Sequence, residues 1–290
     1  MRQIIPSPVC LLALGLLTLT LSACSGASVL NSLTSERGVT VERDLTYGAQ
    51  DRQQYDLYRP SKGSPKGVIV YFYGGSWESG SRSMYAFLGT ALARSGYVVA
   101  VPDYRLYPDV SFPTFVEDGA LALRVVRERV GEDLPLFVMG HSAGAHIGGM
   151  IAFAPRYLQA EGLTPCGAID GFIGISGPYD FVISERYAGT FPPDTRGSAQ
   201  VLSFAKKGRH PPALLLHGTD DNTVEPRDSR QLADTLMASG NQVELQMVEG
   251  AGHIDIIGAI AWPLRFVAPT LSLSTGFADR IAAASPGCGD

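Results

Sequence analysis

One stretch constrains this chain more than any other: residues 136–146, which read LFVMGHSAGAH. Four apolar, β-favouring residues lead into Gly-x-Ser-x-Gly centred on Ser142, and a run of small and apolar residues follows over 143–154. Glycines are needed at Gly140 and Gly144 if a strand turns sharply into a helix, because a side chain at either place would collide with its neighbours. The stretch therefore predicts a strand, a strained turn and a helix that expose Ser142, the pattern of a nucleophile elbow.

The composition sets wide limits around that motif. The chain has 290 residues, of which 45% are hydrophobic and 18% charged, so it is long and apolar enough for a large folded core. We expect a single folded domain over residues 38–290. The formal net charge is -5 and the basic residues are not clustered, which argues against a nucleic-acid partner.

The first residues are typical of a targeting segment. An apolar run over residues 9–21 is shorter than the about 20 residues that span a bilayer, so 1–23 is predicted to be a signal peptide. The run ends in LSAC, which resembles the lipobox of bacterial lipoproteins and predicts a lipid-modified Cys24 that anchors the chain to a membrane. Residues 24–37 would be a flexible tether, and Ser25 favours the outer membrane, facing the periplasm. The alternative is an ordinary signal peptide with an incidental Cys24.

The remaining cysteines suggest a crosslink. Cys10 leaves with the leader and Cys24 would carry lipid, so Cys166 and Cys288 are the pair left in an oxidising compartment. A disulfide between them is expected, and two unpaired thiols are the alternative.

Strand and helix patterns alternate along the chain. An antiparallel pair is predicted over 39–46 and 54–58, and further strands over 68–73, 97–101, 136–139, 172–175, 213–216 and 243–248. Helical spacing falls between them, over 84–95, 113–130, 143–154 and 226–239. This order predicts an α/β fold with a mainly parallel sheet, helices on both faces and a site at the carboxyl ends of the strands. The irregular stretch 177–212 is expected to form a small lid or a surface loop.

A serine nucleophile needs a base, which in such a fold comes late in the chain, on a loop after a strand. His253 follows the last predicted strand and fits that place, so we expect it to shuttle the proton. The other histidines fit less well: His141 and His146 come too early, His217 would anchor a loop, and His210 is expected to be exposed.

The acid should precede the histidine. Asp220 and Asp221 both follow the 213–216 strand, and Asp180 is a further candidate because some hydrolases take the acid from an earlier strand.

A third element must stabilise the negative oxygen of a tetrahedral intermediate. Residues 73–77, YGGSW, follow a predicted strand, and glycines let backbone N–H groups approach a substrate closely. We expect the N–H groups of Gly75 and Ser76, with that of Ala143 from the elbow, to form this oxyanion hole.

These motifs resemble a known family. The chain is similar over about residues 40–260 to α/β-hydrolases of the carboxylesterase and lipase group, near the feruloyl and acetyl esterase and kynurenine formamidase-like branch. The resemblance rests on YGGSW at 73–77, DYRL at 103–106 and GHSAGAH at 140–146. The branch has histidine where this chain has Tyr73. The resemblance implies that Asp221, three residues after Gly218, is the acid.

The expected function is hydrolysis of small, short-acyl carboxylic esters by a Ser142–His253–Asp221 triad through an acyl-enzyme, without a metal or cofactor. Trp77, Tyr107 and Tyr179 are expected to form an aromatic pocket wall. The alternatives are an amidase or formamidase, and a surface-anchored binding protein without turnover.

Overall fold

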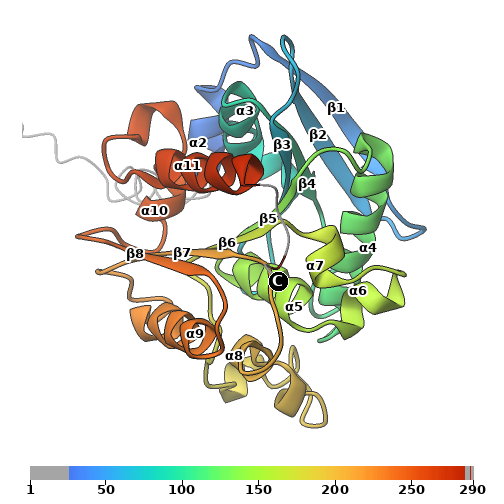
Figure 1. Ribbon diagram of the computed structural model, residues 1–290, viewed down its shortest axis with the longest axis vertical. Coiled ribbons are helices and arrows are strands. Elements are labelled where there is room, and N and C mark those ends of the chain that lie inside the picture. Colours follow the sequence, from blue (N-terminus) through green and yellow to red (C-terminus); the bar gives the residue numbers. More distant parts are fainter. Residues whose placement is uncertain (1–25, 285–287, 289–290) are drawn as a thin grey trace, which may run out of the picture.

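The computed structural model describes residues 26–284 and residue 288. Its centre is an eight-stranded sheet in the order β1-β2-β4-β3-β5-β6-β7-β8 (Figure 1). The strands are β1 (Val39–Thr46), β2 (Gln54–Pro60), β3 (Gly67–Phe72), β4 (Tyr97–Pro102), β5 (Leu136–His141), β6 (Gly171–Ile175), β7 (Ala213–Gly218) and β8 (Val243–Val248). β2 pairs antiparallel with both β1 and β4, and all the other neighbours in the sheet, from β4 through β3 to β8, pair parallel. The predicted α/β-hydrolase fold is confirmed.

The central strands are buried on both faces. Every residue of β3, β4, β5, β6 and β7 is buried, which explains why these strands read as continuous apolar runs rather than as alternating patterns. The edge strands β1 and β8 are only partly covered.

Two layers of helices cover the sheet (Figure 1). α3 (Ala86–Arg94) and α11 (Thr270–Ala283) pack together on one face, and α4 (Thr114–Val130), α5 (Ala143–Phe153) and α9 (Pro226–Ala238) lie on the other. The shorter helices are η2 (Arg82–Tyr85), α6 (Arg156–Ala160), α7 (Pro165–Ala168), α10 (Asp255–Gly258) and η5 (Trp262–Leu264). α11 was not predicted. Over residues 26–284, none of the helices is both long and apolar enough to cross a bilayer.

Part of the predicted flexible tether, residues 24–37, is helical in the structure. Gly26–Ser32 forms helix α2, which packs beside η2 and α3. Asn31 fixes it there, because its side-chain amide donates to the Ser83 carbonyl at 2.8 Å and accepts from the Phe87 N–H at 3.0 Å. A helix this short is marginal alone, so its order comes from these tertiary contacts. Cys24 and the predicted leader lie outside the described residues.

A disulfide joins Cys166, in α7, to Cys288, with the two Cα atoms 5.4 Å apart. The predicted crosslink is therefore present. It ties Cys288, which follows α11, back to α7, which precedes α11 in the chain. The expected exposure of His210 was wrong. His210 is buried, with its ring edge-on to Phe153 and its Nε2 3.1 Å from the Lys207 carbonyl oxygen.

Candidate active site

The turn at Ser142 is strained in the way a nucleophile elbow requires. Ser142 has φ 55° and ψ -124°, a backbone conformation that residues other than glycine rarely adopt. A Cβ on Gly140 would lie 2.3 Å from the Gly144 carbonyl oxygen, and a Cβ on Gly144 would lie 2.1 Å from the Phe72 carbonyl oxygen. Both glycines are therefore fixed by close backbone contact, and together they hold β5 and α5 at the angle that exposes the serine.

The loop after β3 lies directly against this turn. A Cβ on Gly74 would come within 2.9 Å of Ser142 Cβ, so the two loops touch through backbone. Ser76 and Trp77 have φ values of 55° and 62°, which is a second strained segment beside the first. The backbone N–H groups of Gly75, Ser76 and Ala143 have no acceptor among the described residues and are available to a ligand.

The acid and base are joined by a side-chain hydrogen bond. His253 Nδ1 donates to Asp221 Oδ2 at 2.7 Å, which leaves His253 Nε2 free to face a reacting group. The other carboxylate oxygen of Asp221 accepts the N–H groups of Thr223 and Val224, both at 2.9 Å. Asp221 is therefore oriented from both of its oxygens.

His217 completes the setting of the carboxylate. Its Nε2 lies 3.3 Å from Asp221 Oδ2 and 3.0 Å from the Val224 carbonyl, and its Nδ1 is 2.7 Å from Ser229 Oγ. Burial raises the pKa of Asp221, but the hydrogen bonds from His217 and His253 and from the Val224 N–H outweigh burial and hold it well below its usual range. The carboxylate thus stays ionised, and His217 anchors the acid loop as predicted.

His141 links the elbow to the base. Its Nε2 lies 3.0 Å from the His253 carbonyl oxygen, and the two rings lie 4.7 Å apart. Burial, together with the neighbouring His253, lowers the pKa of His141 to about 3, so this imidazole is neutral and donates through Nε2. Among the described residues, no hydrogen-bond partner is found for Ser142 Oγ; in unliganded hydrolases the serine–histidine bond is often long.

The two alternative acids are placed elsewhere. Asp220 is exposed, and its carboxylate accepts the hydroxyl of the neighbouring Thr219 at 3.2 Å. Asp180 is partly exposed, and its backbone N–H, at 3.3 Å, is bonded to Asp228. The described contacts of His253 therefore favour Asp221 over both.

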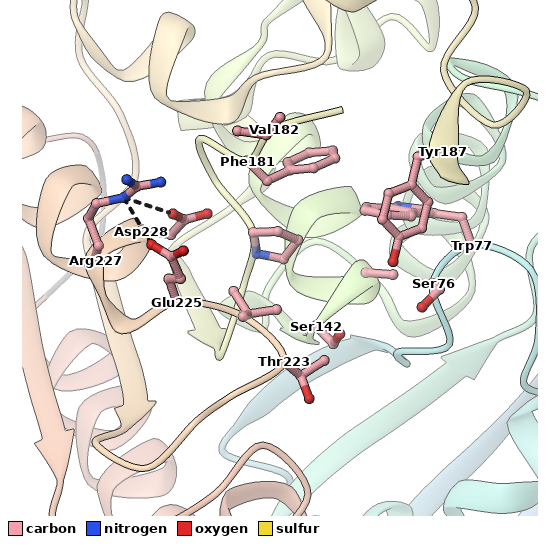
Figure 2. A pocket seen from close by; sticks show the side chains of 13 residues that line it. Ser76, Trp77, Ser142, Phe181, Val182, Tyr187, Thr223, Glu225, Arg227 and Asp228 are labelled. Carbon is pink, nitrogen blue, oxygen red and sulfur yellow. Dashed lines mark ion pairs between the residues drawn. The ribbon is translucent and has the colours of Figure 1, made fainter. Parts of the chain in front are cut away.

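A cavity of about 220 Å³ opens at Ser142. Ser142, Ser76 and Ala143 are among the residues that line it, and Figure 2 shows the two serine side chains at this cavity. Gly75, the third predicted oxyanion donor, does not line this cavity, whereas Trp77 does. The N–H groups of Ser76 and Ala143 are thus the better placed of the three.

The aromatic wall is built differently from the prediction. Trp77 lines the cavity as expected, but Tyr107 and Tyr179 do not. Tyr179 is completely buried, and its hydroxyl would lie 2.0 Å from a Cβ on Gly174, so it packs beneath the site. Tyr107 is directed at Gly189, whose Cβ would lie 2.4 Å from the tyrosine hydroxyl. Nothing in the sequence distinguishes a loop aromatic that faces a site from one that packs under it.

The segment 177–212 provides the aromatic residues that the prediction missed. It contains only short helices, η3 (Glu185–Tyr187), η4 (Arg196–Ser198) and α8 (Val201–Ala205). Phe181 stacks on Trp77 with ring centroids 5.4 Å apart, and Tyr187 meets Trp77 edge-on at 5.6 Å. Phe181, Val182 and Tyr187 line the cavity, so this segment forms part of its cover (Figure 2).

The opposite side of the cavity is charged. Arg227 lies 3.5 Å from the Glu225 carboxylate and 3.9 Å from that of Asp228, and all three residues line the cavity (Figure 2). Burial raises the pKa of Asp228, although hydrogen bonds from the Asp180 and Tyr179 N–H groups oppose this. The cavity therefore combines an aromatic wall with a polar one. None of these three residues was singled out from the sequence.

Tyr73 supports the oxyanion loop in place of the histidine that the related branch carries. Its hydroxyl donates to Asp103 Oδ1 at 2.6 Å and accepts from Arg52 Nη2 at 2.9 Å. Its ring stacks on Tyr104 and Tyr85 at 4.8 and 5.5 Å. Asp103 is held in turn by Arg82, so the loop is tied to a buried ionic network. In residues 26–284, no group of three or more histidine, cysteine or acidic side chains is arranged to hold a metal ion.

Comparison with known proteins identifies relatives of this chain. Residues 55–236 match the BD-FAE family. An Arabidopsis thaliana isoprenylcysteine alpha-carbonyl methylesterase is 29% identical over 74% of this chain, and a Danio rerio kynurenine formamidase is 30% identical over 74% of this chain and 75% of its own length. The match covers 57% of the plant protein, so the chain spans little more than half the length of that relative.

The solved structures show the same fold at lower identity. An inhibited esterase B from Lactobacillus rhamnosis superimposes with a TM-score of 0.76 at 17% identity, over 93% of this chain and 97% of that chain. The family match covers more than half of the chain, and the fold is that of the α/β-hydrolases. The chain therefore belongs to the BD-FAE family.

Proposed function

We propose that this protein is a serine hydrolase that cleaves small carboxylic esters, with Ser142 as nucleophile, His253 as base and Asp221 as the residue that orients it. The observation that carries the proposal is the strained serine turn, which opens into a cavity beside the unpaired N–H groups of Ser76 and Ala143. His141, the residue before this serine, bonds the carbonyl of His253, whose ring is bonded in turn to the buried Asp221 carboxylate at 2.7 Å.

In the proposed reaction, Ser142 Oγ attacks the ester carbonyl carbon while its proton passes to His253 Nε2. The carbonyl oxygen becomes negative and accepts hydrogen bonds from the Ser76 and Ala143 N–H groups, with Gly75 as the further predicted donor. The carbon–oxygen bond to the alcohol then breaks, and His253 returns the proton to the leaving alcohol. Water, deprotonated by His253, attacks the acyl-enzyme and releases the acid and Ser142.

The cavity supports a small substrate. Its volume of about 220 Å³ lies below the about 300–1,000 Å³ of sites for drug-sized ligands. The segment 177–212 contributes short helices only, whereas a lipase lid would need a long amphipathic helix to cover an acyl groove. We therefore propose acyl groups of a few carbons.

Steady-state kinetics on p-nitrophenyl esters test both parts of the proposal. We expect kcat/KM to be higher for the butyrate than for the palmitate ester, and turnover to fall by at least about 10⁴ in Ser142→Ala and in His253→Ala, since the triad acts as a unit. Circular dichroism would show that both variants remain folded. Turnover near that of the wild type in either variant would contradict the triad, and faster cleavage of palmitate would contradict the small acyl site.

Formamide hydrolysis is a second candidate activity, supported by one of the similar proteins. The relative from Danio rerio is named a kynurenine formamidase, and formamide hydrolysis uses the same nucleophile and oxyanion donors. Measuring N-formylkynurenine beside p-nitrophenyl acetate decides between the two substrates. No turnover of either by the folded protein would instead favour a binding protein.

We also propose that Cys24 carries lipid and fixes the protein to a bacterial membrane, with the outer membrane facing the periplasm as the expected site. The sequence LSAC at 21–24 supports this. Metabolic labelling with a fatty acid should mark the wild type and fail in Cys24→Ser. Label that persists in the variant would refute the lipobox.

A further inference from the structure

Most of the exposed apolar side chains of the described residues belong to α2 and its end or to residues 254–267. They border a groove that is separate from the cavity at Ser142 but reaches His141. Eight large hydrophobic side chains are exposed among the described residues, and six of them lie around α2 and η5; Val182 and Met237 lie elsewhere. The six are Val29, Leu33, Ile254, Trp262, Phe266 and Val267. The side chains of Trp262 and Phe266 are 77% and 86% exposed. Single exposed apolar residues are common on protein surfaces, but a cluster of them marks an interaction site.

Four of the six side chains line two hollows that share Leu33, and Phe266 and Val267 follow Trp262 closely in sequence. Val29, Leu33 and Ile254 line an apolar groove of about 680 Å³ between α2 and α10. Leu33 also lines a smaller hollow with Trp262 and Arg265, which joins the groove to the aromatic loop 262–267. We call this surface, from α2 to residue 267, the α2 face.

The charges of the α2 face suit an anionic surface. Arg94 and Arg265 are exposed and line the smaller hollow, and neither guanidinium pairs with a carboxylate of the described residues. The groove contains one acid, Asp255, whose carboxylate accepts the Gly252 N–H at 3.0 Å. Tryptophan and phenylalanine beside arginine are typical of side chains that lie at a membrane–water interface.

The course of the chain identifies the occupant. Gly26 and Ala27 line the groove, and Cys24 is two residues earlier. Two residues span at most about 7 Å, so a lipid on Cys24 would hold this face at the bilayer. We propose that the α2 face rests on the lipid bilayer, with Trp262 and Phe266 inserted among the lipid headgroups and upper acyl chains. The contact with the bilayer goes beyond the hydrolase activity and rests only in part on the proposed acylation of Cys24.

The two tryptophans make a direct test possible. Trp77 is buried and Trp262 is exposed, so tryptophan emission in the full chain reports on Trp262 when Trp262→Phe is the reference. We would place the full-length protein in phosphatidylethanolamine–phosphatidylglycerol vesicles with brominated acyl chains, which quench tryptophan on contact. We expect strong quenching of wild-type emission and little quenching in Trp262→Phe, whose remaining Trp77 is covered.

A matched pair of variants distinguishes membrane contact by the α2 face from nonspecific hydrophobic binding to vesicles. Phe266→Ser should weaken the quenching of Trp262, whereas Met237→Ser, which removes an exposed apolar side chain on α9, should leave it unchanged. Protein that is held by its anchor but has an unquenched Trp262 would overturn the proposal while leaving the lipidation of Cys24 intact. Trp262 emission that is blue-shifted without brominated-lipid quenching would also overturn it, because a second protein copy would then cover the face.

Discussion

The site is assembled from four loops that hold their functional groups in two different ways. The loops after β3 and β5 position Ser76 and Ser142 through backbone, with positive φ values and glycines that touch neighbouring main chain. The loops after β7 and β8 position Asp221 and His253 through side-chain hydrogen bonds to one another and to His217. The first half therefore depends on glycines and main-chain strain. The second half depends mainly on side-chain hydrogen bonds, although it too has one tightly packed glycine, since a Cβ on Gly218 would lie 2.0 Å from the Ala251 carbonyl oxygen.

This difference predicts how each half responds to substitution. A change in the hydrogen-bonded half should lower the reaction rate and leave the fold in place, because the strands below it are buried and unaffected. An added Cβ in the backbone half should lower the stability of the fold, because main chain cannot move aside as a side chain can.

The largest effect is expected at Asp221. Asp221→Asn should lower kcat by about 10³–10⁴, because the amide no longer stabilises the imidazolium or selects the tautomer with Nδ1–H. The change in the free energy of unfolding should be much smaller than the change in activation free energy that corresponds to this fall in kcat. Asp220→Asn, its exposed neighbour, is the control and should retain most of the activity. If Asp220→Asn proved the more damaging of the two, the acid would have to be reassigned.

The next effect is expected at Gly144. Gly144→Ala places a Cβ 2.1 Å from the Phe72 carbonyl oxygen, so we expect a loss of about 3 kcal/mol or more in the free energy of unfolding, measured by urea denaturation. Gly197→Ala is the control, since a Cβ there meets nothing within 4 Å. Equal stability of the two variants would show that the elbow is not set by backbone contact.

Low pH should reduce the stability of the fold through His141, which joins the two halves by its bond to the His253 carbonyl. The unfolded chain protonates His141 near its ordinary pKa of 6.5, whereas in the fold burial and the neighbouring His253 lower the pKa to about 3. Between these values the unfolded state binds more protons, so stability falls as the pH drops from 6.5 toward 3, by up to about 1.4 kcal/mol per pH unit for this group. His141→Gln should show a shallower slope than the wild type in denaturation at several pH values, while Ser142→Ala keeps the wild-type slope. Identical slopes in His141→Gln and wild type would exclude this role of His141.

The smallest effect is expected at Tyr73. Tyr73→Phe loses the hydroxyl that bonds Asp103 and Arg52, and Arg82 still satisfies Asp103, so we expect a loss of about 1–2 kcal/mol in thermal or urea denaturation. Tyr71→Phe, two residues earlier at the end of β3, is a close control, because the buried Tyr71 hydroxyl has no partner in the described structure. A Tyr71→Phe variant that lost as much stability as Tyr73→Phe would mean that the hydroxyl of Tyr73 does not support the loop.

The sequence was informative where local composition decides the structure. Buried strands such as β5 are continuous apolar runs, and the glycines around Ser142 have no other use than a tight turn, so the sheet and the elbow could be predicted. The positions of Asp221 and His253 followed from chain order on such a sheet and from the family resemblance. These features can be read from local pattern and chain order, even where a distant contact, such as that of Gly144 with Phe72, enforces them.

The missed features depend on contacts between distant segments. Helix α2 is ordered by Asn31 bonding to residues more than fifty positions away, which no local pattern encodes. Tyr179 packs beneath the site whereas Phe181, two residues later, faces it, and both lie in a stretch without regular periodicity. Side-chain direction in such a stretch is decided by tertiary packing.

The most direct test of the account is covalent labelling of the nucleophile. The strained elbow and the adjacent His253 should make Ser142 reactive, so a fluorophosphonate probe should attach once per chain, with the label found on Ser142 by peptide mass spectrometry. Ser142→Ala should take no label, and Asp221→Asn should take it more slowly than Asp220→Asn. A folded wild-type protein that takes no label, or takes it on another serine, would contradict the central claim that these four loops activate Ser142.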